Sequence, residues 1–464
     1  MRRTRSRNDP RALTVTERGE LAFDVGPDPR TIGVVLRLAG PAPSEDRLAA
    51  ILAARLPAAP RWASRVRRTP GERPRWDPVA VDVAAHVRTV RSGSATDDDV
   101  LAATVHVMRE PWALGESPPW RVTRVVTGTG RDAVVLTLHH VLTDGTGVLA
   151  TASALLGLAP PDPGTAPPAQ PDPRVRPGRG AGPRVRPGRG AGPRVRPGRG
   201  AGRAPATHRV LGGARTLALG LAELAAGIGP RAPRTVLSAP IGTGFGLAVV
   251  DLDLDRVRAA AHRHGATVND VLLVAGTGAL AGLLARRGDP VTRLVCSVPA
   301  SRARPGDPDR RARTGVLRVA VPTAPGLAAA ERLRRTRART CRRRRFVSGE
   351  SAPLLAWGFA TLGRWGAYGP VLARQRLINT VVSNLRGPAE PIALAGVPVE
   401  AVVPVASAAG NVPVYFTALS YAGRLRVTLR ADERWAGELP ALADDVRAVV
   451  AELVDDAPRP RLGS

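Results

Sequence analysis

The chain has 464 residues and a formal net charge of +29, and its 68 basic residues are all arginine because the sequence contains no lysine. The lack of lysine excludes a P-loop, a pyridoxal Schiff base and the strand lysine of protein kinases. Aromatic residues make up only 3% of the chain, which argues against binding single-stranded nucleic acid by base stacking.

Length and composition predict a globular protein with two or more core-forming units. Two cysteines, Cys296 and Cys341, are too few for a disulfide framework and fit a reducing cytosol. The longest apolar run, Val271–Ala285, is shorter than the roughly 18 residues of a membrane span. No apolar segment follows the basic N-terminus, so we expect no secretory signal. The bias toward Ala, Gly, Pro and Arg is typical of a G/C-rich genome, such as an actinobacterial one.

The N-terminal third alternates strand-like and helix-like segments. A helix is predicted over Ser44–Ala58, because Ser44 is a favourable N-cap and apolar residues follow at helical spacing. Strands are predicted at Ile32–Leu38, Val122–Thr127 and Ala133–Leu138. We therefore assign residues 1–160 to one subdomain.

The decapeptide PRVRPGRGAG occurs three times in succession over residues 173–202. Pro and Gly disfavour helix and strand, and the nine arginines of the repeat repel one another. We predict that residues 161–205 form a disordered linker. The repeat is either a tether for nucleic acid or membrane, or a linker expanded by slippage without a selected role.

The remainder, residues 206–464, again mixes helices and strands. One helix is predicted to stop at Gly265, a second to begin near Asn269, and a third to cover Leu439–Val454. The Arg-rich run Arg332–Phe346 is either a solvated helix face or a patch for phosphate or anionic lipid. Strands are predicted at Arg293–Ser301, Val316–Thr323, Asn379–Asn384 and Val414–Asp432, the last with a hairpin turn at Tyr421–Arg424. This interleaving predicts an α/β or α+β fold.

Two of the seven histidines lie side by side in LTLHHVLTDGTGVLA, residues 136–150. His139 and His140 end a predicted strand, and a helix begins just after Gly145. Successive strand residues face opposite sides, so the pair is poorly suited to one metal ion, and we expect no metal site. One imidazole in a cleft is suited to act as a general base near neutral pH. Asp144 would orient the loop, and the alternative role for both histidines is packing or capping.

HHxxxDG is the signature of the coenzyme A-dependent acyltransferase superfamily. The chain more specifically resembles the bacterial wax ester synthase/diacylglycerol acyltransferase family, and the matching segments follow the family's order. These segments are PPWRVTRVV (118–126), PRTVLSAPIG (233–242), ATVNDVLL (266–273), NTVVSNLRGP (379–388) and LSYAGRLRVTL (419–429).

This resemblance implies two chloramphenicol-acetyltransferase-like subdomains facing each other across a tunnel. Acyl-CoA would be a co-substrate, with no bound cofactor, and His140 would take the proton from the hydroxyl of diacylglycerol or a long-chain alcohol. The oxygen would attack the thioester directly, giving triacylglycerol or wax ester. The catalytic residues would be His140 with His139, Asp144 and Gly145, and substrate binding or structural support would fall to Asn269, Asp270, Ser383 and Asn384.

The resemblance and the positive charge together suggest a cytoplasmic protein that attaches peripherally to an anionic membrane or lipid droplet. No nucleic-acid partner is expected. Two alternatives remain: a condensation-type acyltransferase that uses a carrier-bound or natural-product substrate, and an inactive basic paralogue that binds membrane or nucleic acid.

Overall fold

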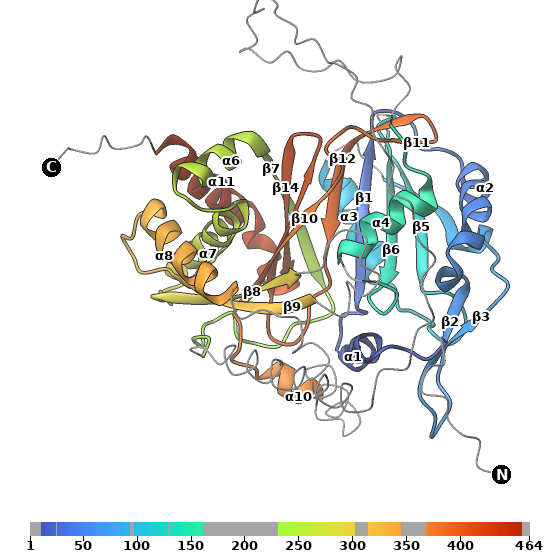
Figure 1. Cartoon of the computed structure of the whole chain (residues 1–464), viewed down its shortest axis with the longest axis horizontal. Coiled ribbons are helices and arrows are strands. Elements are labelled where there is room, and N and C mark those ends of the chain that lie inside the picture. Colours follow the sequence, from blue (N-terminus) through green and yellow to red (C-terminus); the bar gives the residue numbers. More distant parts are fainter. Residues whose placement is uncertain are drawn as a thin grey trace, which may run out of the picture.

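Two six-stranded mixed β-sheets lie side by side in the computed structural model of the chain (Figure 1). The predicted α/β class is thereby confirmed. The structure describes residues 11–24, 26–92, 97–128, 130–143, 145–160, 231–301, 314–344 and 368–456. The predicted linker, residues 161–205, lies outside these ranges.

The first sheet has the strand order β11-β12-β1-β6-β5-β4, in which only β4 and β5 run parallel. Its helices are α1, α2, α3 and α4, and a separate hairpin, β2–β3, lies at its edge (Figure 1). The strands are β1 (Thr31–Leu38), β4 (Val87–Arg91), β5 (Trp120–Val126), β6 (Ala133–His139), β11 (Ala393–Leu394) and β12 (Val397–Val405), with β2 (Ser64–Arg67) and β3 (Arg75–Pro78) in the hairpin. The helices are α1 (Val15–Phe23), α2 (Glu45–Arg55), α3 (Asp97–Met108) and α4 (Gly145–Leu156).

Strand β6 is buried along its whole length, which explains its nearly continuous apolar sequence. Its odd-numbered residues, such as Val135, pack with Val107 of α3, whereas its even-numbered residues, such as Leu136, pack with Leu48 of α2 and Val148 of α4. Alternating side chains thus bury both faces of the sheet. His139 lies four residues after Val135 on the same strand, so its side chain points to the same face of the sheet, the α3 side.

The second sheet has the strand order β7-β14-β13-β10-β8-β9, with β10 parallel to both of its neighbours. Helices α6, α7, α8 and α11 cover it (Figure 1), and the short helix α10 lies below. The strands are β7 (Phe245–Asp253), β8 (Arg293–Ser301), β9 (Thr314–Pro322), β10 (Thr380–Arg386), β13 (Val414–Tyr421) and β14 (Arg424–Asp432). The helices are α6 (Leu254–Arg263), α7 (Val268–Arg286), α8 (Ala329–Arg344), α10 (Tyr368–Ala373) and α11 (Leu439–Asp455).

Most predicted elements are present with boundaries shifted by a few residues. Ser44 caps α2 by accepting the amide of Arg47 at 3.2 Å, and Gly265 separates α6 from α7 with a positive φ of 60°. The predicted hairpin turn joins β13 to β14, where Ala422 and Gly423 have φ values of 45° and 77°. Two consecutive positive φ angles match the twist of the flanking strands.

Helix α7 is long and apolar enough, by length and composition, to cross a membrane, so the prediction that its apolar run is too short was wrong. However, 67% of its most apolar window is buried inside the protein. Its side chains pack in one core cluster with residues of α11 and the second sheet, including Phe416 and Leu442. The apolar character of α7 is therefore accounted for by its position in the core.

Strands β11 and β12 belong to the C-terminal part of the sequence but complete the N-terminal sheet. β12 pairs with β1 from Gly33–Val405 to Leu38–Val399, and Ala159 forms an isolated bridge with Ala393. The predicted division into residues 1–160 and 206–464 did not anticipate this exchange, because strand pairing between distant segments leaves no local pattern in the sequence.

Leu394→Ala tests whether the exchanged strands hold the N-terminal sheet together. Leu394 is fully buried in the same cluster as Trp62 and Trp120, so its truncation should lower the free energy of unfolding by about 2–5 kcal/mol. Urea unfolding followed by tryptophan fluorescence measures this change. Val397→Ala, at a half-buried position in the same segment, is the control and should cost clearly less; equal small losses would contradict the assignment.

Candidate active site

The two histidines lie where β6 ends and the chain turns toward α4. The amide of His139 donates to the carbonyl of Pro119 at 3.0 Å, and the amide of His140 donates to the carbonyl of Arg30 at 3.0 Å. Both backbone positions are therefore fixed by neighbouring segments of the N-terminal half. His139 is fully buried, whereas the His140 side chain retains 21% of its accessible surface.

The ring of His139 has a defined orientation. Its Nδ1 accepts the amide hydrogen of Val141 at 3.0 Å, so the proton of the neutral ring resides on Nε2. That Nε2 lies 3.4 Å from Oδ2 of Asp24 at the end of α1. With both nitrogens facing protein groups in a buried position, His139 supports the turn.

His140 faces a second acidic residue of the same helix. Its Nδ1 lies 3.5 Å from Oε2 of Glu20, a separation typical of a charge pair and longer than a hydrogen bond. The Glu20 side chain is mostly buried, with 18% of its surface exposed. Nδ1 is therefore the ring nitrogen of His140 that faces Glu20.

Arg30 contacts this pair from the segment before β1. Its NH2 group donates to Oε2 of Glu20 at 2.6 Å. Its backbone has a positive φ of 51°, and its amide donates to Oδ1 of Asp28 at 3.1 Å. A non-glycine residue rarely adopts this conformation, and the Asp28 side chain stabilises it.

Arg430 of β14 connects the C-terminal half of the chain to Asp28, and through Asp28 to Arg30. Its guanidinium forms a buried ion pair with Asp28 and lies over the Phe245 ring, 3.8 Å from the centroid. Burial raises the pKa of Glu20, but the charges of His140 and Arg30 outweigh that effect, so the pKa of this carboxyl lies below its ordinary value. Glu20 is therefore negatively charged at neutral pH.

Of the two remaining residues of the HHxxxDG motif, the structure describes Gly145 only. Gly145 is the first residue of α4, in agreement with the predicted start of a helix. Asp144 lies outside the described residues, so its predicted role in orienting the loop stays a prediction.

The predicted supporting residues of the second half form their own contacts. Asn384 of β10 donates through Nδ2 to Oδ1 of Asn269 at 2.6 Å, which links the start of α7 to the second sheet. Ser383 is half-buried and, with Leu272 and Phe416, lines a small apolar void between α7 and that sheet. The structure therefore brings Asn269 and Asn384 together, whereas Ser383, which lies between Val382 and Asn384 on β10, has its side chain on the other face of the strand.

Asp270 has a structural environment. It is 1% exposed and forms a capping box with Thr267, whose amide donates to Oδ2 at 2.9 Å. Its other oxygen accepts the hydroxyl of Thr340 of α8 at 2.7 Å. These contacts fix the N-terminus of α7 against α8. Of the two roles predicted for Asp270, they favour structural support over substrate binding.

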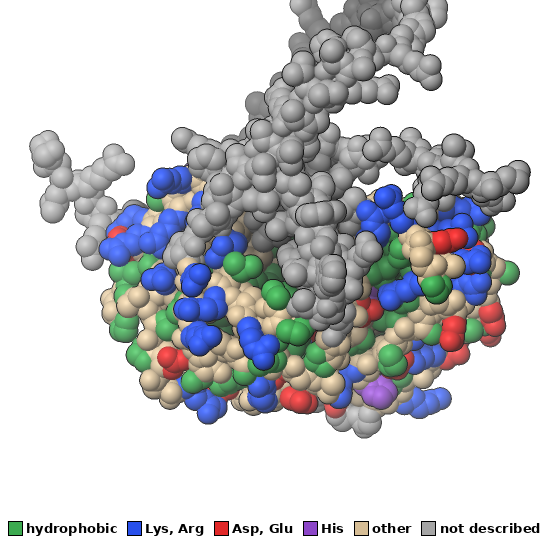
Figure 2. Space-filling model, turned by 90° about the horizontal axis from the view of Figure 1, so that it is seen from below, with side chains coloured by type: hydrophobic (Ala, Val, Ile, Leu, Met, Phe, Trp, Pro, Cys, Tyr) green, Lys and Arg blue, Asp and Glu red, His purple; other side chains and the backbone are tan. Residues whose placement is uncertain are grey.

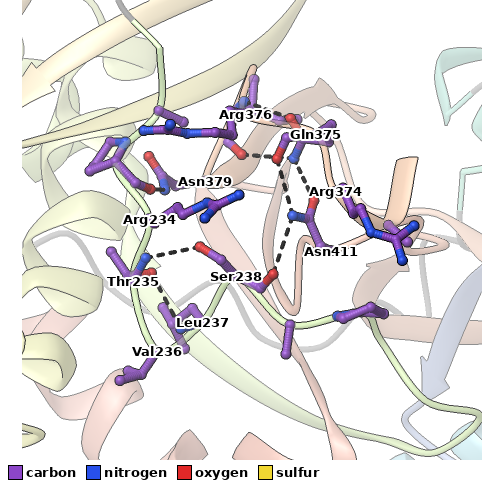
Figure 3. Close-up of a pocket in the computed structure, with 16 residues that line it drawn as sticks. Arg234, Thr235, Val236, Leu237, Ser238, Arg374, Gln375, Arg376, Asn379 and Asn411 are labelled. Carbon is purple, nitrogen blue, oxygen red and sulfur yellow. Dashed lines mark hydrogen bonds between the residues drawn. The ribbon is translucent and has the colours of Figure 1, made fainter. Parts of the chain in front are cut away.

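A cavity of about 510 Å³ opens in the C-terminal half, and its lining includes neither histidine of the turn. Figure 3 shows its polar wall, in which Gln375 donates to Asn411 at 2.7 Å and Asn411 donates to the carbonyl of Ser238 at 3.3 Å. Asn379 is held by its own bond to the carbonyl of Pro233 at 2.9 Å. The lining consists of residues 232–240 and 373–376 with Ile378, Asn379 and Asn411.

Three arginines, Arg234, Arg374 and Arg376, line this cavity, and no carboxylate does. Their guanidinium groups form no hydrogen bond or ion pair with any residue that the structure describes. Most described arginines elsewhere, such as Arg30 and Arg430, have acidic or carbonyl partners. An excess of unpaired positive charge around a preformed polar wall is suited to an anionic group.

Proton transfer is the chemistry that the histidine turn supports. Across the described ranges, no three residues among His, Cys, Asp and Glu are grouped to hold a metal ion. The accessible His140 beside a charged carboxylate resembles the base and orienting acid of hydrolytic and transfer enzymes in its arrangement.

Glu20, Asp24, Arg30 and Arg430 were not among the site residues predicted from the sequence. Glu17, Glu20 and Asp24 recur at spacings of three and four residues and so share a helix face, a signal in the sequence that went unused. No comparable local signal points to Arg430, which approaches from a strand 400 residues downstream of Arg30.

Comparison with known proteins gives a consistent result over most of the chain. The model of the wax ester synthase/diacylglycerol acyltransferase catalytic domain matches residues 32–272, and that of the WS/DGAT C-terminal domain matches residues 313–453. The chain is 26% identical over 446 residues, 91% of each protein, to "Probable diacyglycerol O-acyltransferase tgs1" of Mycobacterium tuberculosis. It is 28% identical over 205 residues to "O-acyltransferase WSD" of Acinetobacter baylyi, covering 43% of this chain and 44% of that protein.

Solved structures share the fold. The wax ester synthase/diacylglycerol acyltransferase of Marinobacter aquaeolei VT8 superposes with a TM-score of 0.64 at 22% identity, covering 95% of this chain and 98% of that one. The first condensation domain of the CDA synthetase superposes with a TM-score of 0.56 at 17% identity, covering 96% of each chain. The predicted two-subdomain acyltransferase fold is confirmed.

Proposed function

The chain belongs to the wax ester synthase/diacylglycerol acyltransferase family, and from this premise we propose that it transfers a fatty acyl group from acyl-CoA to the hydroxyl of diacylglycerol or a long-chain alcohol. The observation that carries the proposal is the accessible imidazole of His140 at the strand-to-helix turn, beside the charged Glu20. The names of the mycobacterial relatives support diacylglycerol as the first acceptor to test.

In this mechanism Nε2 of His140 accepts the hydroxyl proton of the acceptor. The oxygen then bonds to the thioester carbonyl carbon, the carbon–sulfur bond breaks, and the proton passes from the imidazolium to the departing thiolate of coenzyme A. No covalent acyl-enzyme is needed, because both substrates meet at one base.

His140→Ala should lower the rate of acyl transfer roughly 10²- to 10⁴-fold, the usual effect of losing a general base. Thiol release from palmitoyl-CoA, with diacylglycerol and then hexadecanol as acceptor, measures the rate. The melting temperature should change little, since the His140 side chain is partly exposed.

His139→Ala provides the comparison. His139 is fully buried and bonded to Val141, so its loss should act mainly through stability. Equal, mild effects of both substitutions would rule out His140 as the base. A wild-type protein inert with both acceptors would favour the condensation-type alternative, in which the acyl donor is carrier-bound.

We further propose that the arginine-lined cavity binds the phosphates of the coenzyme A portion. Guanidinium groups suit phosphate because they donate two parallel hydrogen bonds. The cavity also adjoins the charge network of the histidine turn. Its residue Asn411 lies two residues after Ala409, whose amide donates to the Tyr415 hydroxyl at 3.1 Å, and Tyr415 lies within electrostatic reach of Arg30.

Arg234→Ala and Arg376→Ala should each raise the KM for palmitoyl-CoA roughly tenfold, the effect expected from losing one charged hydrogen bond. The KM for a palmitoyl thioester of N-acetylcysteamine, which has no phosphate, should not change. Arg256→Ala removes an exposed arginine of α6 paired with Asp455 and serves as the matched control. Equal increases for both thioesters would contradict a phosphate site.

We also propose peripheral attachment to anionic membranes or lipid droplets. Figure 2 shows arginine side chains spread over both halves of the face seen from below, with fewer acidic ones. Helix α8 adds four exposed arginines, Arg334, Arg335, Arg339 and Arg342. Each basic residue near an anionic surface contributes about 1 kcal/mol, and salt weakens the attraction.

Flotation with phosphatidylglycerol vesicles measures this attachment. The protein should float with the vesicles at low salt and separate from them at high salt, and phosphatidylcholine vesicles are the control. Replacing the four exposed α8 arginines by glutamine should weaken binding. Binding that survives high salt would indicate hydrophobic insertion in place of charge attraction.

A further inference from the structure

We propose that Glu20 is the positioning residue of the base: its carboxylate keeps the neutral imidazole of His140 protonated on Nδ1, so that Nε2 is the nitrogen that accepts the acceptor proton. This inference rests on the proposed function, because it assigns a partner to the base of that reaction. The tautomer of the His140 imidazole can also be measured without turnover.

The geometry of the Glu20–His140 pair carries the proposal. Nδ1 of His140 and Oε2 of Glu20 are 3.5 Å apart, and both side chains are largely shielded from water. Hydrogen bonds of catalytic groups are often long in structures without substrate and shorten in the reactive complex. A carboxylate at this distance favours a proton on the facing nitrogen and stabilises the imidazolium that forms during transfer.

Arg30 holds both members of the pair at once. Its carbonyl accepts the amide of His140 at 3.0 Å, while its guanidinium donates to Glu20 at 2.6 Å. The left-handed backbone at Arg30 lets one residue point its carbonyl and its side chain to these two partners. Movement of Glu20 relative to His140 would therefore require a change at Arg30.

Other charged groups around the turn have different partners. Asp24, also from α1, faces His139, and Asp28 is bound by Arg430 of β14. Tyr415 of β13 lies near Arg30 and Arg430, and burial raises its pKa, so it remains neutral. Among these described groups, Glu20 is the negative charge that faces His140.

Histidine-selective ¹⁵N NMR titration tests the proposal without any substrate. The signals of His140 are identified by their loss in His140→Ala. In the wild-type protein the neutral ring should carry its proton on Nδ1. In Glu20→Gln it should become a mixture of tautomers and titrate at lower pH, because the charged partner of the imidazolium is gone. An unchanged tautomer and midpoint would overturn the proposal.

Kinetics provide the second readout. Glu20→Gln should lower kcat at least roughly tenfold, as loss of an orienting acid does, with the KM for acyl-CoA unchanged. The acidic limb of the pH–rate profile should move to lower pH. Since the pKa of Glu20 lies below its ordinary value, this limb reports the imidazole and not the carboxyl. Glu20→Asp, which keeps the charge, should recover part of kcat.

The matched control is Glu110→Gln, a carboxylate bound by Arg88 at 2.6 Å and Arg121 at 3.2 Å with no contact to the turn. A loss of activity in Glu20→Gln with the acidic limb unmoved would show a merely structural role. If Glu20→Gln does not fold, Glu20→Gln/Arg30→Met removes the unpaired buried charge, and the NMR titration decides.

The two proposals fail in different ways. A wild-type protein without acyl transfer, or a His140→Ala variant with full activity, would overturn the proposed function. The tautomer and titration of His140 in Glu20→Gln would still decide the role of Glu20.

Discussion

The pairing of β12 with β1 is the constraint on which the rest of the structure depends. β1 is hydrogen-bonded on its other side to β6, so β12 from the C-terminal half fixes the strand that positions the histidine turn. Apolar residues of both halves also meet around this junction, where Val35, Val403 and Phe245 share one cluster. Because this contact is both hydrogen-bonded and apolar, the halves have little freedom to separate at this edge, and a site composed of both becomes possible.

A series of ion pairs and hydrogen bonds also connects the two halves. Arg430 of the second sheet binds Asp28, Asp28 holds the backbone of Arg30, and Arg30 binds Glu20, which faces His140. Buried ion pairs add little stability on their own, since desolvation offsets the attraction. Such pairs are better explained by the orientation they enforce. In this protein they fix the position of a carboxylate beside the imidazole.

The arginine excess has more than one role. Some arginines bind carboxylates or carbonyl oxygens inside the fold, as Arg30 and Arg430 do. Others, such as Arg234 around the cavity, have no anionic partner among the described residues. A net charge of +29 is therefore a poor guide to function until each guanidinium is assigned a partner, since the same residue type serves as structural cation and as candidate ligand.

The sequence by itself determined the local elements and singled out His140 as the candidate base. Strand β6, the cap at Ser44, the stop at Gly265 and the turn at Tyr421–Arg424 follow from short-range patterns, because backbone conformation and amphipathic spacing are local properties. His140 was predicted from its place between strand and helix. Only the tertiary structure decided which strands pair and what surrounds His140. The transfer of β12 to the first sheet and the convergence of Glu20, Arg30 and Arg430 depend on contacts between distant segments, which leave no periodic signal in the chain.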